Sequence, residues 1–437
     1  MPPSPPTPAA EPPSPAVSST AGYFRWAICA LLLFGTTKNY MDRNVLGVLN
    51  KTLQHDLGWT EIDFSNLVIV FQAAYAAGMV VTGPLIDRLG ARLGYALAMI
   101  FWSLASMSTA LANSLTSFAI SRAALGFGEA AIFPASIKAV AEWFPKKERA
   151  LSTGIFNAGT SFGAMLAPVA VVWLNARWGW RGAFVGIGAL GFIWLFFWLL
   201  IYRKPEDHPS VSKAELDYIR SDPQDVPAKT KWSTLVPLRQ TWAFVAGKFL
   251  TDPVWWFFLF WTPGFLQSQH HLALTGLGPP IIAIYLISDV GSVAGGWISS
   301  TLIKRGHTVN VARKVAMLIC AIGVIPVVFA YRVESTLSAV LLIGLATACH
   351  QGFSANLFTL ASDMFPARAV GSVVGIGGMA GAITGMFNAA IVGHVLQWTG
   401  SYKVPFLMAG SSYLLALALI HALAPKLEPA TVVDRPA

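Results

Sequence analysis

The chain has 437 residues, of which 55% are hydrophobic and 12% are charged, with a formal net charge of +9 and a mean hydropathy of +0.58. Soluble globular domains carry about 25% charged residues, so this chain has too few to cover a water-facing surface. The composition excludes an ordinary soluble protein and predicts one whose surface is mostly in contact with lipid.

The N-terminal segment differs from the rest of the chain. Residues 1–20 contain eight prolines and neither lysine nor arginine. A signal peptide begins with basic residues, whereas a proline-rich segment poor in apolar residues is typical of disorder. We expect a disordered cytoplasmic tail over 1–22 and a second cytoplasmic tail over 425–437.

Between these tails lies a succession of apolar runs. A membrane-spanning helix needs about 20 apolar residues. Twelve runs of that order follow one another: 24–50, 62–85, 93–112, 116–142, 150–174, 181–202, 241–267, 279–303, 312–331, 336–364, 370–397 and 403–424. The sequence therefore predicts an all-α membrane protein with twelve transmembrane helices.

The loop between the second and third runs carries a motif. Its matched positions within G-x-L-x-D-R-x-G-x-R are Gly83, Leu85, Asp87, Arg88, Gly90 and Arg92. The motif resembles the loop signature of the major facilitator superfamily. A glycine turn, a carboxylate at a helix boundary and two cations would form a gating latch at the cytoplasmic face; the alternative is a tight basic loop that only sets orientation.

Six runs lie on each side of a long polar stretch, and features recur across it. Phe144-Pro145 returns as Phe365-Pro366 at an offset of 221, and the same offset relates Gly154 to Gly375. We expect two six-helix bundles, 23–202 and 241–424, joined by a cytoplasmic linker over 203–240. Repeats of this kind place a substrate site between the halves, near mid-membrane.

Lysine and arginine determine the expected orientation because they accumulate on the cytoplasmic side. If the first helix runs outward, the inner loops hold 17 of them and the outer loops 5, namely Lys51, Arg177, Arg181, Arg332 and Lys403. Both termini are then cytoplasmic in a bacterial inner membrane. This bias explains the net charge without a nucleic-acid partner.

Charged residues inside apolar runs are candidates for function, because a charge there costs at least about 2.5–3.5 kcal/mol. By the rise of a helix, Asp42 and Arg122 lie at a similar depth and can neutralise each other. Arg43 is then left to bind a substrate carboxylate with its planar fork. Glu129 lies two turns after Arg122, among residues that favour a protonated carboxyl. We expect Asp42 and Glu129 to carry protons; for each, the alternative is a structural contact between helices.

Further candidates lie on other helices. Lys248 and Asp252 are four residues apart and are expected to pair, and Pro253 interrupts the same helix. Trp256 offers a flat wall for a sugar ring, although lipid contact or packing is an equal alternative. The expected substrate-binding residues are Arg43, Tyr40, Tyr75, Arg122, Asn157, Thr160, Lys248, Trp256, Gln351 and Asn388. For any one Asn or Gln, helix–helix hydrogen bonding is at least as good an explanation.

Several blocks together resemble the anion:cation symporter branch of the major facilitator superfamily, and within it the bacterial hexuronate and sugar-acid transporters. They are Asn39–Arg43, Arg122 with Glu129, Ala139–Arg149, Asn157 with its neighbours, and Lys248–Trp256. The resemblance implies proton-driven uptake by alternating access. It also implies that Asp42 and Glu129 take up protons, that Arg43 meets the substrate carboxylate and that Arg122 pairs with Asp42. Thr160 stands where some relatives have Gln.

We therefore predict a proton-coupled importer of a hexuronate, such as galacturonate or glucuronate, that works as a monomer in the lipid bilayer. The alternatives are a symporter for another organic anion (galactonate, glucarate or an aromatic acid), a drug–proton antiporter, and a membrane sensor or enzyme. No metal or cofactor is expected, because Cys29, Cys320 and Cys349 lie in apolar runs without a metal or redox spacing.

Overall fold

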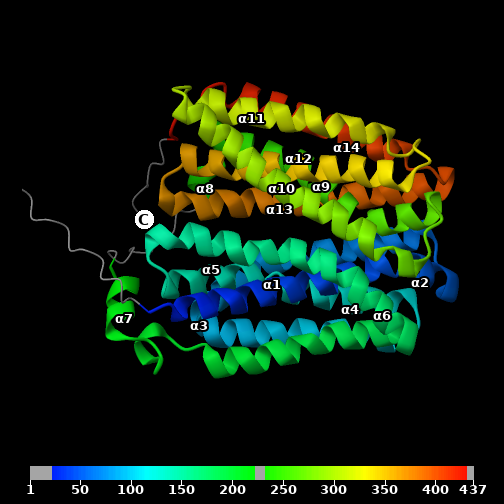
Figure 1. Cartoon of the computed structure of the whole chain (residues 1–437), viewed down its shortest axis with the longest axis horizontal. Coiled ribbons are helices and arrows are strands. Elements are labelled where there is room, and N and C mark those ends of the chain that lie inside the picture. Colours follow the sequence, from blue (N-terminus) through cyan, green and yellow to red (C-terminus); the bar gives the residue numbers. More distant parts are fainter. Residues whose placement is uncertain (1–21, 222–231, 431–437) are drawn as a thin grey trace, which may run out of the picture.

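The computed structural model describes residues 22–221 and 232–430, and every regular element within them is helical (Figure 1). The predicted tail over 1–22 lies outside the described residues except for Gly22, as does 431–437 of the second tail. The α-helices are α1 Phe24–Val48, α2 Asn50–Leu57, α3 Glu61–Ser108, α4 Leu115–Glu129, α5 Ile132–Trp143, α6 Lys146–Ile201, α7 Lys213–Ile219, α8 Trp232–Leu235, α9 Arg239–Gln269, α10 Gly278–Lys304, α11 Val309–Val324, α12 Thr336–Met364, α13 Ala367–Thr399 and α14 Lys403–Leu423.

Ten helical segments of the described residues are long and apolar enough to cross a membrane. One of them, Leu151–Ile201, has 51 residues, more than twice the length of a single crossing. Helix α1 is not among the ten, because it carries the polar cluster described below. Counting α6 as two crossings and α1 as one is consistent with the twelve predicted helices.

Two glycines explain why pairs of predicted helices appear as continuous elements. Gly90 in α3 has φ 78° and Gly179 in α6 has φ 66°, and both have non-helical ψ angles. Only glycine adopts such angles readily, so the chain turns back at each without a long loop. Gly90 belongs to the loop motif predicted from the sequence.

The helices form two groups, which lie on opposite sides of the molecule in Figure 1. We call α1–α6 the first half and α8–α14 the second half. Pro145 precedes α6 and Pro366 precedes α13, with closely similar φ and ψ angles, so the offset of 221 seen in the sequence relates equivalent helix starts. Between the halves, α3 lies against α13, α6 against α10 and α1 against α9.

Part of the polar segment between the halves lies within the described residues. Helix α7 lies at one end of the molecule and α2 at the opposite end (Figure 1). Arg25 connects α7 to the first half: its Nε lies 2.8 Å from Glu148 Oε2 and its Nη1 lies 3.3 Å from Glu215 Oε1. The segment after Tyr202 is thus held against the start of α1.

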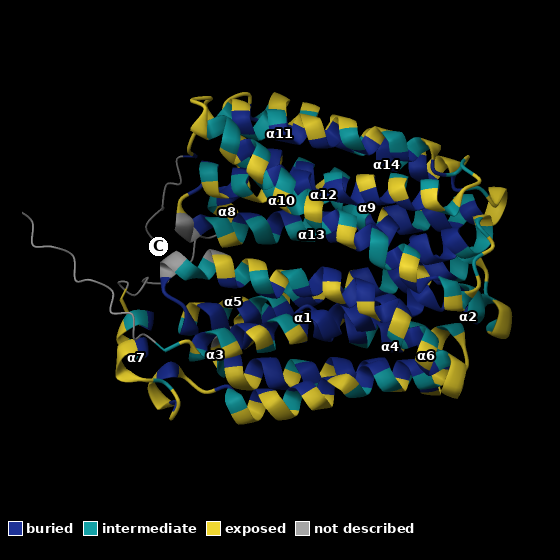
Figure 2. Ribbon diagram, in the orientation of Figure 1, coloured by how far each residue is buried: buried dark blue, intermediate teal, exposed yellow. Residues whose placement is uncertain are grey.

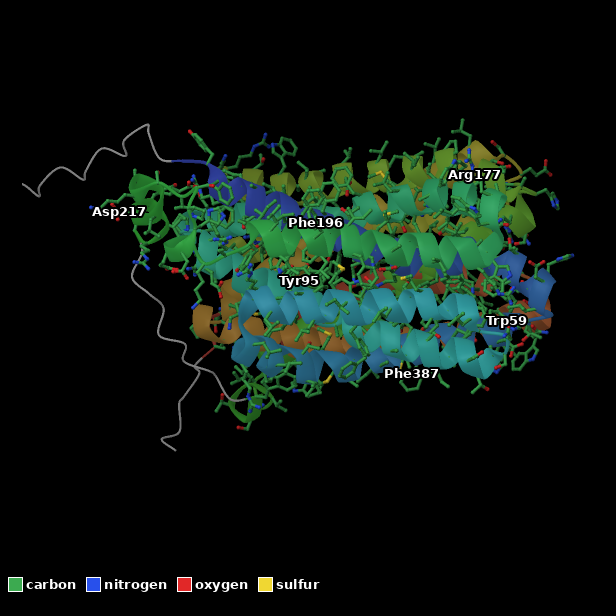
Figure 3. The ribbon with its side chains drawn as sticks, turned by 90° about the horizontal axis from the view of Figure 1, so that it is seen from below. Trp59, Tyr95, Arg177, Phe196, Asp217 and Phe387 are labelled. Carbon is green, nitrogen blue, oxygen red and sulfur yellow. The ribbon has the colours of Figure 1, made fainter. Side chains whose placement is uncertain are left out.

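Many large apolar side chains lie exposed on the outer faces of the helices. Figure 2 shows buried residues concentrated in the interior of the helix groups and exposed residues on their outer faces. Phe196 and Phe387 are 63% and 65% exposed and lie along the sides of the molecule, whereas Trp59 and Arg177 lie near one end and Asp217 near the other (Figure 3). Exposed aromatic side chains along the helices are suited to contact with lipid.

Candidate functional site

A break in the fourth transmembrane segment places Glu129. The predicted membrane span over 116–142 is present as Leu115–Trp143, but within it two turn residues separate α4 from α5, a break that the sequence did not predict. Pro134 has no N–H to bond the carbonyl of Ala130, so one helical hydrogen bond is missing at the break. The hydroxyl of Thr82 on α3 donates to that carbonyl instead, at 3.2 Å. Glu129 is consequently the last residue of α4 and is fully buried.

Helix α1 carries the other charged residues of the site, and α6 packs closely against it. A side chain at Gly159 or Gly163 would collide with the backbone of Thr37. Every residue of α1 from Gly35 to Val48 is buried. The polar residues of this stretch must find partners inside the protein.

Arg43 and Glu129 form a buried ion pair. Arg43 Nη2 lies 2.9 Å from Glu129 Oε2 and Nε lies 3.1 Å from the same oxygen. The two side chains are at most 1% exposed. Sequence reasoning left Arg43 without a protein partner, and in this structure it has one.

Four aromatic rings surround the guanidinium of Arg43. Its Cζ lies 4.7 Å from the ring centre of Tyr40, 4.9 Å from Tyr75, 5.2 Å from Trp256 and 5.3 Å from Phe71. Trp256 lies on α9 of the second half, and the other three belong to the first half. We call these four rings the aromatic box. It joins both halves around one cation, and three of its members were predicted to bind substrate.

Asp42 points away from Arg43 and has a different partner from the one expected. Lys38 Nζ lies 2.5 Å from Asp42 Oδ2, and the hydroxyl of Ser106 donates to Asp42 Oδ1 at 2.8 Å. The expected ion pair of Asp42 with Arg122 is therefore wrong for this structure. Lys38 was missed, although its spacing of four residues from Asp42 was the available signal.

Arg122 is left without a hydrogen-bond partner. None of its three guanidinium nitrogens is bonded to any described residue, and the side chain is fully buried. Its Cζ lies 4.7 Å from the ring of Phe71, the ring that also faces Arg43. Asn39 Nδ2, Glu129 Oε1 and both polar atoms of the Gln72 side chain are also buried and unbonded among the described residues. A native interior rarely leaves so many polar atoms unsatisfied, so this cluster is suited to a polar ligand or water.

In the second half, the expected pair of Lys248 with Asp252 is present at 2.7 Å. Trp255 stacks on His350, with ring centres 4.9 Å apart. Asn388 donates to the carbonyl of Pro253 at 3.1 Å, which is the helix–helix alternative considered for its amide. These contacts stabilise α9 where Pro253 interrupts its hydrogen bonding.

The remaining predicted residues are less clustered. Thr160 is 7% exposed, Asn157 is exposed and Gln351 is half-buried. Next to Thr160, the hydroxyl of Ser161 donates to Asp289 of α10 at 2.5 Å, a bond between the halves that the sequence did not predict. It shows that α6 and α10 meet beside the predicted contact residues.

The loop motif is only partly described. The side chain of Asp87 lies outside the described residues, and Arg88 and Gly83 lie on α3 before the kink at Gly90. Arg92 donates to the carbonyl of Leu199 at 2.7 Å, and Trp198 donates to the carbonyl of Arg92 at 2.9 Å. The motif thus connects the kink in α3 to the end of α6.

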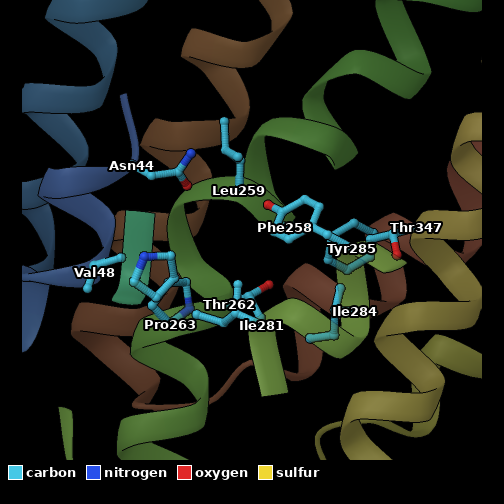
Figure 4. A pocket seen from close by; sticks show the side chains of 11 residues that line it. Asn44, Val48, Phe258, Leu259, Thr262, Pro263, Ile281, Ile284, Tyr285 and Thr347 are labelled. Carbon is cyan, nitrogen blue, oxygen red and sulfur yellow. The ribbon is translucent and has the colours of Figure 1, made fainter. Parts of the chain in front are cut away.

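A small pocket between α1, α9 and α10 lies near the aromatic box but does not contain it (Figure 4). Asn44 and Thr262 are among its few polar lining residues. It has room for about one water molecule, so it is too small for a sugar acid.

Solved structures support the fold. A D-xylose-proton symporter aligns with a TM-score of 0.70 at 16% sequence identity, covering 93% of this chain and 99% of that chain. A bacterial homologue of the human lysosomal transporter Spinster, in an inward-facing and occupied conformation, aligns with a TM-score of 0.68 at 17% identity, covering 93% and 96%.

Curated relatives are more similar in sequence. The hexuronate transporter of Escherichia coli strain K12 is 33% identical over 383 residues, which is 86% of this chain and 88% of the relative. The galacturonate transporter of Dickeya chrysanthemi is 35% identical over 306 residues, covering 68% and 88%. The probable L-galactonate transporter of Escherichia coli strain K12 is 30% identical over 387 residues, covering 87% and 85%.

The family model for the Major Facilitator Superfamily matches residues 32–387, which include most of α1, the loop motif, the helix break at Glu129 and the aromatic box. The all-helical fold, the repeated helix starts and the structural matches agree with it. The chain is a multi-pass membrane transporter, not an enzyme, and it belongs to the major facilitator superfamily.

Proposed function

We propose that this transporter imports a sugar acid together with protons, and that a hexuronate such as galacturonate is its substrate. The observation that carries the proposal is the Arg43–Glu129 pair inside the aromatic box. The names of the hexuronate and galacturonate transporters that it resembles support the substrate class.

Arg43 provides the recognition of the anion. Its guanidinium presents a planar fork that binds a carboxylate through two hydrogen bonds, and in this structure Glu129 occupies that fork. A substrate carboxylate would compete with Glu129 for the same nitrogens. Trp256 and Tyr75 flank the guanidinium, so a sugar ring attached to that carboxylate can pack on their faces.

Proton coupling follows from this competition. Once the substrate takes Arg43, Glu129 is a buried carboxylate that has lost its hydrogen-bonded cation. An uncompensated charge inside a protein is strongly unfavourable, and a carboxyl avoids it by binding a proton. Binding of the anion and protonation of Glu129 therefore favour each other. Asp42 was predicted as a second proton carrier, and we propose that role for it as well.

Alternating access would then involve the two bundles, 23–202 and 241–424. Arg43 belongs to the first and Trp256 to the second, so bound substrate would connect them. Movement of one bundle against the other would open the aromatic box to either side. We further propose the bacterial inner membrane as its location, cytoplasmic termini and a monomeric transporter, based on the lysine and arginine bias and on a site built within one chain.

The substitution Glu129→Gln tests the coupling. Glutamine has the shape of a protonated glutamate, so the variant should still exchange labelled galacturonate across proteoliposome membranes. It should fail to accumulate galacturonate against its gradient, because the empty carrier cannot release a proton. The matched control is Glu142→Gln: Glu142 accepts a hydrogen bond from Tyr202 outside this site, and accumulation should persist.

Two results would contradict the proposal. Uphill uptake by Glu129→Gln at the wild-type rate would remove Glu129 from coupling. Accumulation by the wild type with protons equilibrated on both sides would remove proton coupling altogether.

Galactonate and the aldarates are the second candidate substrates, because relatives named as probable L-galactonate and galactarate/D-glucarate transporters are 30% and 27% identical to this chain. Competition of labelled galacturonate uptake by a panel of these acids distinguishes the candidates. Stronger inhibition by galactonate or glucarate than by unlabelled galacturonate would replace the hexuronate proposal.

A further inference from the structure

Asp289 is a carboxylate between the two halves that has no cation beside it. It lies on α10 and is half-buried, and its Oδ1 accepts a hydrogen bond of 2.5 Å from the hydroxyl of Ser161 on α6. Among the described residues, Ser161 is its only hydrogen-bond partner, and no basic side chain pairs with it. In contrast, Asp42, Glu129 and Asp252 each form an ion pair. The charge of Asp289 is therefore not compensated within the described part of the chain.

The packing of α6 places Asp289 close to the aromatic box. Its partner Ser161 precedes Gly163 by two residues, and a side chain at Gly163 would collide with Tyr40, one ring of the box. Two residues of α6 correspond to a rise of about 3 Å, and the three residues from Tyr40 to Arg43 on α1 add about 4.5 Å. A six-carbon sugar acid can span the distance between these levels.

Helix α10 also faces the site through Tyr285. Tyr285 lies one helical turn before Asp289, so both side chains are on the same face of α10. The ring of Tyr285 contacts that of Trp255 on α9, with centres 6.0 Å apart, and Trp256 of the aromatic box is the next residue. The face of α10 that carries Asp289 is therefore turned toward both α6 and α9, where a substrate between the halves would bind.

We propose that Asp289 is a specificity-determining residue that selects a sugar acid with one carboxylate over a sugar acid with two. The inference rests on the proposed function, in which Arg43 binds the substrate carboxylate. At the other end of its carbon chain a hexuronate has the C1 hydroxyl, which can donate a hydrogen bond to Asp289. An aldarate has a second carboxylate there, which cannot donate and is repelled by a like charge. The hydroxyl of Ser161 and the partial exposure of Asp289 favour its charged form.

The substitution Asp289→Asn tests the selection by charge. Asparagine keeps the shape and an oxygen that can accept from Ser161, but it removes the charge. Binding of galacturonate and of galactarate to purified protein is measured by calorimetry. The wild type should bind galacturonate at least about tenfold more tightly, and in Asp289→Asn this ratio should fall about tenfold because galactarate binds more tightly. An unchanged ratio in the variant, or equal binding of the two acids by the wild type, would overturn the inference.

Two controls separate the charge from the bond between the halves. Ser161→Ala removes the bond and keeps the carboxylate, so the preference for galacturonate should persist. If Ser161→Ala lost the preference as Asp289→Asn does, the bond between the halves would be its cause and the inference would be overturned. Asp363→Asn is the matched acid control: Asp363 is half-buried and pairs with Arg313 outside this site, so the ratio should not change.

A modified substrate tests the hydroxyl directly. In the methyl glycoside of galacturonate the C1 oxygen carries a methyl group and can no longer donate. The wild type should bind it about tenfold more weakly than galacturonate, the effect of losing one hydrogen bond to a charged group. Asp289→Ala should bind the two with similar affinity, since the acceptor is gone. Equal binding of the two by the wild type would overturn the assignment of the C1 hydroxyl to Asp289.

These outcomes separate the inference from the proposed function. Equilibrium binding does not depend on coupling, so a wild type that fails to accumulate galacturonate in a proton gradient would refute the proposed function and leave the preference for galacturonate over galactarate measurable. An unchanged preference in Asp289→Asn, in a protein that accumulates galacturonate with protons, would overturn the inference alone.

Discussion

Replacing Arg43 by lysine separates the geometry of its side chain from its charge. Arg43 donates two hydrogen bonds to Glu129 Oε2, from Nε at 3.1 Å and Nη2 at 2.9 Å. Lysine keeps the charge but cannot form both bonds in the plane of a carboxylate. A hydrogen bond that involves a charged group contributes about 1.5–3 kcal/mol. If the substrate carboxylate uses the same fork, its affinity should fall by about tenfold to a hundredfold, since 1.4 kcal/mol is a factor of ten.

The assay is binding of galacturonate to purified protein by calorimetry, together with thermal unfolding. Stability should change less than affinity, because the lysine still compensates the charge of Glu129. Arg181→Lys is the matched control: Arg181 also donates two hydrogen bonds, to Ala110 and Asn113, and faces the ring of Trp180 at 4.2 Å, but outside the cluster. Wild-type affinity in Arg43→Lys, or an equal loss in the control, would refute the assignment of the carboxylate to Arg43.

Two further predictions concern the fold around the site. Thr82→Val removes the hydroxyl that donates to the carbonyl of Ala130, which Pro134 leaves without its helical partner. The free energy of unfolding should fall by about 1–3 kcal/mol, the cost of an unsatisfied buried polar group. Unchanged thermal stability would contradict this account of the helix break. Arg25→Gln removes the ion pair with Glu215 on α7, together with the pair with Glu148 on α6, so amide hydrogen exchange should increase over 213–219. Arg220→Gln, which breaks an exposed pair with Glu206, should change exchange elsewhere in the fold very little. Equal protection in wild type and Arg25→Gln would show that α7 is held by other contacts.

The sequence was sufficient to locate the long apolar helices. Each of them is marked by the length of its apolar run and by the charged loops that flank it, and both can be read directly along the chain. The motif residue Gly90 and the offset of 221 also correspond to local geometry, namely a backbone turn and two helix starts. The break after Glu129 was missed, although Pro134 was visible, because a proline near a membrane helix end is often tolerated.

The partners of the buried charges could not be obtained in the same way. Depth along a helix suggested that Asp42 meets Arg122, but depth does not determine the direction in which each side chain points. The packing of α1 against α3 and α6 turns Asp42 toward Lys38 and Ser106, and it turns Arg43 toward Glu129. The direction of each side chain depends on residues far apart in the chain, such as the glycines of α6 that allow α1 to pack closely against it.

The spacing of Lys38 and Asp42 also affects how the protein enters the membrane during synthesis. Lys248 and Asp252 repeat it 210 residues later, so the first long helix of each half carries a lysine and an aspartate four residues apart. Such a pair forms as soon as its own helix forms, without any neighbour. Each charge inserted alone would cost about 2.5–3.5 kcal/mol, and pairing within the helix reduces that cost. The Arg43–Glu129 pair, by contrast, needs α1 and α4 together. The positions of the charges thus separate those that can insert with a single helix from those that become stable only when the bundle has assembled.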